Sequence, residues 1–168
     1  IKKHLVFCLI GLVLIFAFSK LSIKNLILFS IIIFSISIIL SIATIFFFPE
    51  TKGASRWIRV FNFSFQSTEI LKPTFVILSS LLLGRYKSKK DFSFILNITL
   101  FSVISLILLS QPDFGMFILF FCVWILQILN SNIEKKIILP IIFLFVIAFI
   151  LSYFFLDHVK FRIDNFLF

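Results

Sequence analysis

Charged residues, glycine and proline are all scarce in this chain. Of its 168 residues only 14% are charged, and glycine and proline number four each. So few helix breakers leave no room for a flexible linker or a low-complexity tail. The hydrophobic share is 61% and the mean hydropathy is +1.21. A small water-soluble domain cannot bury that much apolar surface, so we expect the solvent of this protein to be a lipid bilayer.

Cysteine is rare as well, and the two cysteines, Cys8 and Cys122, lie far apart inside apolar runs. Their positions do not suggest a metal site, and we expect each to be a buried thiol. The sequence also lacks a glycine-rich phosphate loop, a nucleophile elbow and a zinc-binding HExxH motif. Any chemistry must therefore come from polar residues scattered within or between the apolar runs.

The sequence does contain six long apolar stretches separated by short polar ones. As a helix, residues 26–48 would be about 34 Å long, enough to cross a hydrocarbon core about 30 Å thick. We therefore expect an all-α fold, a polytopic transmembrane helix bundle that forms a single, partial membrane domain over residues 1–168. Because the sequence begins with Ile1 and not with Met, we interpret it as the middle of a longer protein. The expected spans are residues 5–23, 26–48, 67–84, 92–110, 114–130 and 137–156.

Most of the lysines and arginines behind the net charge of +9 sit between the apolar stretches. Basic residues in that position contact lipid headgroups or orient a membrane protein, so the charge predicts a membrane as partner and no nucleic acid. The loops on the two sides hold nearly equal numbers of lysine and arginine. Charge alone therefore does not fix the orientation of the chain.

A polar and aromatic loop at residues 49–66 separates the second span from the third. Its mixture of Trp57 with Arg56 and Arg59 is typical of a segment that lies in the membrane interface. The two arginines suit either anchoring at headgroup depth or direct hydrogen bonds to a phosphate. Trp57 and Trp124 are interpreted as anchors at the depth of the bilayer surface.

The third span carries two ionisable residues, Glu69 and Lys72, three positions apart on one helical face. Such groups are costly in lipid, so they should face protein or water and find partners. They suit either an ion pair that pins helices together or a polar cavity for an ionic headgroup. Ser67 or Thr68 is expected to cap the start of this helix, and Pro73 is expected to kink or restrict it.

Another carboxylate, Asp113, lies at the break between the fourth and fifth spans, in the run Gln111–Gly115. One interpretation is a loop carboxylate that caps the next helix. The other is a residue that contacts the same cavity as Glu69 and Lys72.

Three motifs occur in an order that resembles the SEDS family (FtsW/RodA/SpoVE) of bacterial inner-membrane glycosyltransferases. They are GASRWI at residues 53–58, QSTEILKP at residues 66–73 and QPDFG at residues 111–115. The chain departs from the family pattern at Ser67-Thr68, where the family usually has Pro-Ser. Lys52, Lys72-Pro73 and the tail resemble the cell-division member more than the elongation member, which shapes the cell.

The resemblance implies that the chain is the middle of a fold of about ten helices that polymerises lipid II into peptidoglycan. It implies that the loop at residues 49–66 faces the periplasm and that residues 157–168 begin the family's large periplasmic loop. The catalytic aspartate of the family lies beyond Phe168, so no catalytic residue is expected in this chain. The residues implied to line the substrate cavity are Glu69, Lys72, Gln66, Arg56, Arg59, Gln111, Asp113 and Arg162.

The implied partners are lipid II, a class B penicillin-binding protein, other membrane proteins of the division machinery, and the membrane itself. No metal site is expected from the residues, and a divalent cation is left open as a cofactor. Two other functions suit the same residues: a flippase or transporter for lipid-linked precursors, and a non-catalytic scaffold that docks the penicillin-binding protein.

Overall fold

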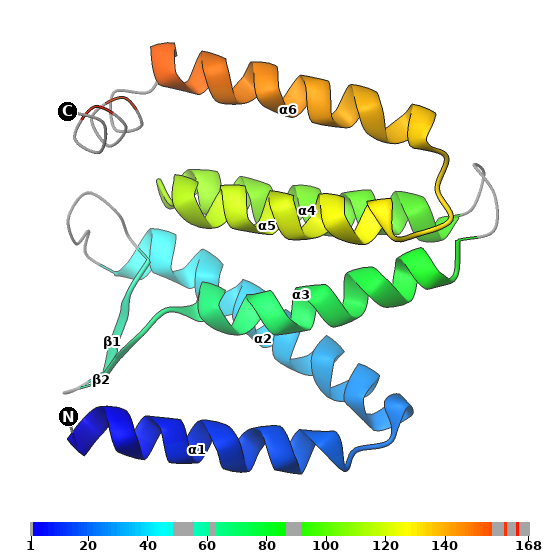
Figure 1. Ribbon diagram of the computed structural model, residues 1–168. Coiled ribbons are helices and arrows are strands. Elements are labelled where there is room, and N and C mark those ends of the chain that lie inside the picture. Colours follow the sequence, from blue (N-terminus) through cyan, green and yellow to red (C-terminus); the bar gives the residue numbers. More distant parts are fainter. Residues whose placement is uncertain are drawn as a thin grey trace.

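The computed structural model describes residues 2–48, 56–60, 63–86, 92–155, 160 and 164. Within this part of the chain, six helices carry nearly all the regular structure, as the all-α prediction requires (Figure 1). A short pair of strands between the second and third helices was not predicted. The elements are α1 (Lys2–Ser19), α2 (Ile23–Phe47), β1 (Ile58–Val60), β2 (Phe63–Phe65), α3 (Ser67–Gly84), α4 (Phe92–Ser110), α5 (Phe114–Leu129) and α6 (Lys135–Phe155).

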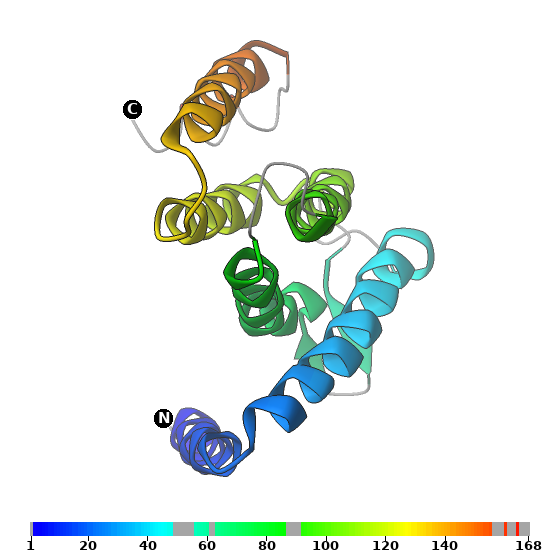
Figure 2. The same ribbon diagram turned by 90° about the vertical axis from the view of Figure 1, so that its right-hand side faces the viewer.

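The helices α2 to α5 form the centre of the structure. α3 contacts α2, α4 and α5, and α5 also contacts α6. Viewed along the bundle, α1 and α6 lie at opposite ends of the row (Figure 2). α3 thus contacts every other central helix, and α4 also contacts α2 and α5 directly.

Three helices are long and apolar enough to cross a membrane, namely α2, α3 and α4. Shorter apolar helical segments lie at Cys8–Ser19, Phe114–Leu129 and Ile138–Ile147 among the described residues. The helices overlap the six stretches expected to span the membrane, and it remains a prediction that all six cross it. Which of their ends faces the periplasm remains a prediction.

The helix α2 presents its large apolar residues outward and its small hydroxyl residues inward. Ile39 is 66% exposed and Phe46 is 75% exposed. The buried residues of α2 are Ser30, Ser37, Ser41 and Thr44. Their spacing keeps them on one helical face, which we call the hydroxyl seam. Small residues let two helices approach closely in lipid, where no hydrophobic force drives helices together, so the seam suits packing of α2 on α3.

The core between α3, α4 and α5 is aromatic, with one buried polar link. Trp124 is 3% exposed and stacks on Phe101 at a centroid distance of 4.2 Å. Its Nε1 donates to Asn97 Oδ1 at 2.6 Å, and Asn97 Nδ2 donates to Ser79 Oγ at 2.8 Å. This chain of bonds ties α5 through α4 to α3. The prediction that Trp124 anchors the bilayer surface is wrong, because its ring fills the core.

The prediction of buried thiols is also wrong, since Cys8 and Cys122 are both exposed. Cys122 lies on the outward side of α5, next to the buried Phe121. A uniformly apolar run indicates that a residue lies in the membrane, but it does not indicate which face of the helix the residue occupies.

We expect Trp124→Phe to lower the free energy of unfolding by about 1 kcal/mol, because a buried acceptor on Asn97 loses its donor while the ring stacking persists. Equilibrium unfolding of the full-length protein in mixed detergent micelles measures this change. Trp57→Phe is the matched control, since Trp57 is 37% exposed. Equal losses in the two variants would contradict the structural role of the Trp124–Asn97 bond.

Candidate functional site

A β-hairpin forms the base of the candidate site. β1 and β2 pair antiparallel, with Ile58 opposite Phe65 and Arg59 opposite Ser64. The hairpin projects from the bundle where α3 begins (Figure 1). This register brings the two residues before β1 close to the residue after β2. Arg56 and Gln66 are therefore held near each other at the open end of the hairpin.

Asp113 joins these two residues. Arg56 Nη1 lies 2.7 Å from Asp113 Oδ1, and Gln66 Nε2 donates to Asp113 Oδ2 at 2.9 Å. Asp113 is only 3% exposed, so its carboxylate depends on these two partners. We call Arg56, Gln66 and Asp113 the polar cluster. One residue comes from each of the three sequence motifs, so segments far apart in the chain converge on one carboxylate.

The turn before α5 presents Asp113 to its partners. The N–H of Asp113 donates to the carbonyl of Leu108 at 2.9 Å, and its own carbonyl accepts from the N–H of Phe117 at 3.1 Å. Asp113 occupies the N-cap position of α5, but its side chain makes no capping hydrogen bond. The interpretation of Asp113 as a side-chain cap is therefore wrong, because its carboxylate is taken by Arg56 and Gln66.

The start of α3 differs from the prediction in the same way. Gln66 is the N-cap residue and makes no side-chain capping bond, whereas Ser67 and Thr68 lie inside the helix and are fully buried. Ser67 Oγ lies 2.7 Å from Ser41 Oγ of α2. Thr68 Oγ1 has no partner among the described residues. The predicted capping role of Ser67 or Thr68 is therefore wrong. The N-cap position falls on Gln66, so both hydroxyl residues lie within the first turn of the helix and are buried against protein.

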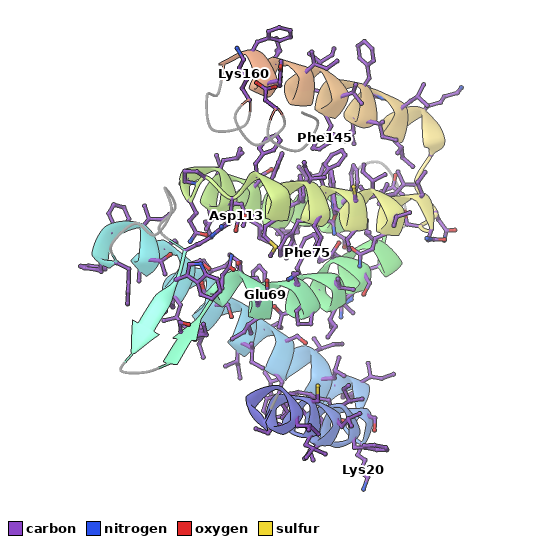
Figure 3. All side chains as sticks on the ribbon, turned by 60° about the vertical axis from the view of Figure 1, so that its left-hand side comes forward. Lys20, Glu69, Phe75, Asp113, Phe145 and Lys160 are labelled. Carbon is purple, nitrogen blue, oxygen red and sulfur yellow. The ribbon has the colours of Figure 1, made fainter. Side chains whose placement is uncertain are left out.

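Glu69 and Lys72 form an ion pair on the surface of α3. Lys72 Nζ lies 2.7 Å from Glu69 Oε2, as the spacing of three predicts. The Glu69 side chain is 55% exposed and that of Lys72 is 27% exposed. The pair lies within one helix, so it does not pin two helices together in the described structure. Figure 3 shows Glu69 and Asp113 on different helices, toward the end of the bundle that carries the hairpin.

Pro73 follows directly on Lys72 and does not end the helix. α3 continues through it to Gly84. Thr74 Oγ1, next in sequence, donates to the carbonyls of Ile70 and Leu71 at 3.2 and 3.0 Å. Proline lacks an N–H, so the carbonyl of Glu69, four residues earlier, loses its usual helical donor.

Gln111 is fully buried and connects the turn to α2. Its Nε2 donates to the carbonyl of Ser41 at 2.8 Å and to Thr44 Oγ1 at 2.7 Å. Its Oε1 has no partner among the described residues. Ser41 and Thr44 were not predicted as site residues. The signal that could have found them is the spacing of hydroxyl residues along α2, which otherwise consists almost entirely of Ile, Leu and Phe.

Two predicted site residues, Arg59 and Arg162, have no described side-chain contact. Arg59 lies in β1, with only its strand pairing described, and Arg162 lies outside the described residues. Within the described part of the chain, no three His, Cys, Asp or Glu side chains gather as metal ligands. The structure thus brings together Arg56, Gln66 and Asp113, and sets Glu69 and Lys72 on the same end of α3.

The two ion pairs differ in burial, and this difference should be measurable. In a double-mutant cycle of Arg56→Gln and Asp113→Asn, we expect a coupling free energy of about 1–3 kcal/mol, because each single change strands a charge away from water. The matched cycle of Glu69→Gln and Lys72→Gln should give about 0.3–0.5 kcal/mol, as for exposed pairs along a helix. Unfolding in mixed detergent micelles measures both, and equal couplings would contradict the assignment of Asp113 as a buried hub.

Curated relatives match part of the chain. The chain is 40% identical over 67 residues to the "Probable peptidoglycan glycosyltransferase FtsW" of Geobacter sulfurreducens, which covers 38% of this chain and 18% of that protein. It is 28% identical over 86 residues to the protein of the same name from Hydrogenovibrio crunogenus, covering 49% of this chain and 22% of that protein. The aligned part is therefore a minor share of either relative.

Solved structures share the fold over most of the chain. A structure described as "Structural coordination of polymerization and crosslinking by a peptidoglycan synthase complex" matches with a TM-score of 0.74 at 21% identity, covering 98% of this chain and 51% of that one. The rod shape determining protein RodA of Thermus thermophilus matches with a TM-score of 0.67 at 22% identity, covering 82% and 46%. The chain thus spans about half the length of these structures, and at such identities the likeness shows the fold alone.

The family model for FtsW, RodA and SpoVE, described as "Cell cycle protein", matches residues 1–167. The match takes in the GASRWI, QSTEILKP and QPDFG motifs, whose side chains meet at Asp113. The chain is therefore a multi-pass membrane protein that belongs to the FtsW/RodA/SpoVE (SEDS) family.

Proposed function

We propose that the protein containing this chain is a peptidoglycan glycosyltransferase that polymerises lipid II in the bacterial inner membrane. The observation that carries the proposal is the convergence of the family's three motifs on the buried carboxylate of Asp113. Burying a charge carries a large desolvation penalty, and replacing buried ions by apolar residues is often neutral for stability. Stability alone therefore does not explain a buried carboxylate at this position. Recognition of a charged, lipid-borne sugar provides a reason.

Arg56 is the residue best suited to bind the pyrophosphate of the substrate. Its guanidinium has five N–H donors, and the described contact with Asp113 uses Nη1. The Arg56 side chain is 23% exposed, so N–H donors outside the contact with Asp113 would be within reach of a phosphate oxygen. Asp113 would orient this fork rather than touch the substrate.

Glu69 and Lys72 would contribute to the same substrate site as Arg56. The four charged side chains of Arg56, Lys72, Glu69 and Asp113 cancel in net charge. Binding of an anion would then depend on the direction of the N–H donors and not on an excess of positive charge. An incoming phosphate would compete with Glu69 for Lys72, whose ion pair is half exposed and therefore easily exchanged.

The reaction implied for this site is an inverting glycosyl transfer. The 4-hydroxyl of the acceptor sugar attacks the anomeric carbon of the donor, and a carboxylate beyond Phe168 accepts its proton as general base. The bond from the anomeric carbon to the pyrophosphate oxygen breaks, and undecaprenyl pyrophosphate leaves. Arg56 and Lys72 would stabilise the negative charge that develops on the leaving phosphate.

The same proposal extends to partners and cellular role. We propose a class B penicillin-binding protein and other division proteins as partners, and septal rather than lateral wall synthesis as the process. The support for a division role is that the curated relatives carry the name FtsW. The support for a polymerase partnered by a crosslinking enzyme is the fold shared with a chain of a peptidoglycan synthase complex.

We expect Glu69→Ala and Lys72→Ala, each in the full-length protein, to abolish polymerisation of lipid II while thermal stability changes little. Both side chains are partly exposed, so their loss leaves no cavity in the core. Gel analysis of glycan strands made from purified lipid II measures the activity. Val76→Ala is the control, because Val76 lies on the exposed side of α3. Full activity in both Ala variants would remove Glu69 and Lys72 from the site.

Two rival functions predict different results. A flippase would move lipid II headgroups across liposome membranes without making glycan strands. A non-catalytic scaffold would support growth of cells in which the family's catalytic aspartate, beyond Phe168, has been substituted. Either result would overturn the proposed polymerase activity.

A further inference from the structure

The helix α2 supplies no charged residue to the polar cluster, yet it contacts both chain segments that carry the cluster. Ser41 Oγ lies 2.7 Å from Ser67 Oγ, next to Gln66. The carbonyl of Ser41 accepts from Gln111 Nε2 at 2.8 Å, two residues before Asp113. One residue of α2 therefore touches the start of α3 and the turn before α5 at the same time.

Thr44 completes the contact with the turn. Its Oγ1 accepts from Gln111 Nε2 at 2.7 Å and donates to the carbonyl of Ser41 at 2.7 Å. Both hydrogens of the Gln111 amide are thereby used, and the side chains concerned are fully buried. The amide cannot be turned around, because its Oε1 would then face the carbonyl oxygen of Ser41, which only accepts. The orientation of Gln111 is thus determined by α2.

Fixing Gln111 also fixes Asp113. Only Pro112 stands between them, and the N–H of Asp113 is already bonded to the carbonyl of Leu108. Asp113 must place one oxygen within reach of Arg56 and the other within reach of Gln66. A shift of the turn would weaken one of these two contacts, because the two partners lie on separate segments and each bond depends on distance and angle.

We propose that Ser41 and Thr44 are positioning residues for the substrate site, acting through Gln111 on Asp113 and through Ser67 on Gln66. The proposal rests on the proposed function of the polar cluster. Thr44 and Ser41 do not contact substrate; they hold Arg56 indirectly, by holding the carboxylate that orients its guanidinium. Positioning of this kind affects the rate of the chemical step more than substrate affinity.

The test compares variants of the full-length protein in lipid nanodiscs. Thr44→Val keeps the shape of the side chain and removes one of the two acceptors of Gln111, and Thr44→Ser restores that acceptor. Ser41→Ala, which fits without steric conflict, breaks only the hydroxyl contact with Ser67. Ser30→Ala is the matched control: Ser30 is a buried residue of the same seam, and among the described residues its hydroxyl bonds to the carbonyl of Leu26 in its own helix.

Two measurements are made on each variant. With lipid II, we expect kcat of Thr44→Val to fall about tenfold with KM nearly unchanged. We expect a smaller fall, of about threefold, in Ser41→Ala, with kcat near the original value in Thr44→Ser and Ser30→Ala. Hydrogen exchange of the peptide covering residues 108–117 should be faster in Thr44→Val and unchanged in Ser30→Ala.

The results distinguish failure of the positioning role of Ser41 and Thr44 from failure of the proposed polymerase function. An unchanged kcat in Thr44→Val, an equal loss in Ser30→Ala, or unchanged exchange around Asp113 would overturn the positioning role. Should Thr44→Val not fold, Ser41→Ala decides by the same criteria. If the unsubstituted protein makes no glycan strands, the proposed function fails, and the exchange measurement alone then decides whether α2 holds the turn.

Discussion

The ion pair between Arg56 and Asp113 sets the arrangement of the described structure. Asp113 is almost fully buried, and a carboxylate there is stable only when a cation and further donors surround it. Arg56 supplies the cation and Gln66 the second donor, so three separate segments must meet at one point. The antiparallel register of the hairpin meets this requirement, because it brings the two donors together at its open end.

The surrounding helices are joined by buried polar contacts as well as by the aromatic core, and their outward faces are apolar. Lipid chains are as apolar as leucine, so burial of Ile or Phe between helices offers little advantage over exposure to lipid. The interior therefore contains the hydroxyl seam of α2 and the link from Trp124 through Asn97 to Ser79. The same bonds that join the helices thus also place the polar cluster.

Much of this fold could be predicted from the sequence, because length and hydropathy determine where a helix lies in a membrane protein. The convergence of Arg56, Gln66 and Asp113 was implied by a family resemblance and not by any spacing in the chain. The faces of the helices could not be predicted: α2 is apolar nearly all round, so its hydropathy does not reveal that Ser and Thr point inward. Trp124 was misplaced for the same reason, since an amphipathic ring suits both a membrane surface and a core with a buried acceptor.

The inverted face of α2 has a consequence for how such chains diverge. Four small hydroxyl residues of this helix are buried where it packs on its neighbour, while large apolar residues of its outward side, such as Ile39 and Phe46, are exposed. Exchange among Ile, Leu, Val and Phe at these exposed positions removes no helix–helix contact, so such mutations should change the stability of the fold little. Two related proteins can therefore have low sequence identity along such a helix while the helix keeps its position in the bundle. This agrees with the shared fold at only 21% identity.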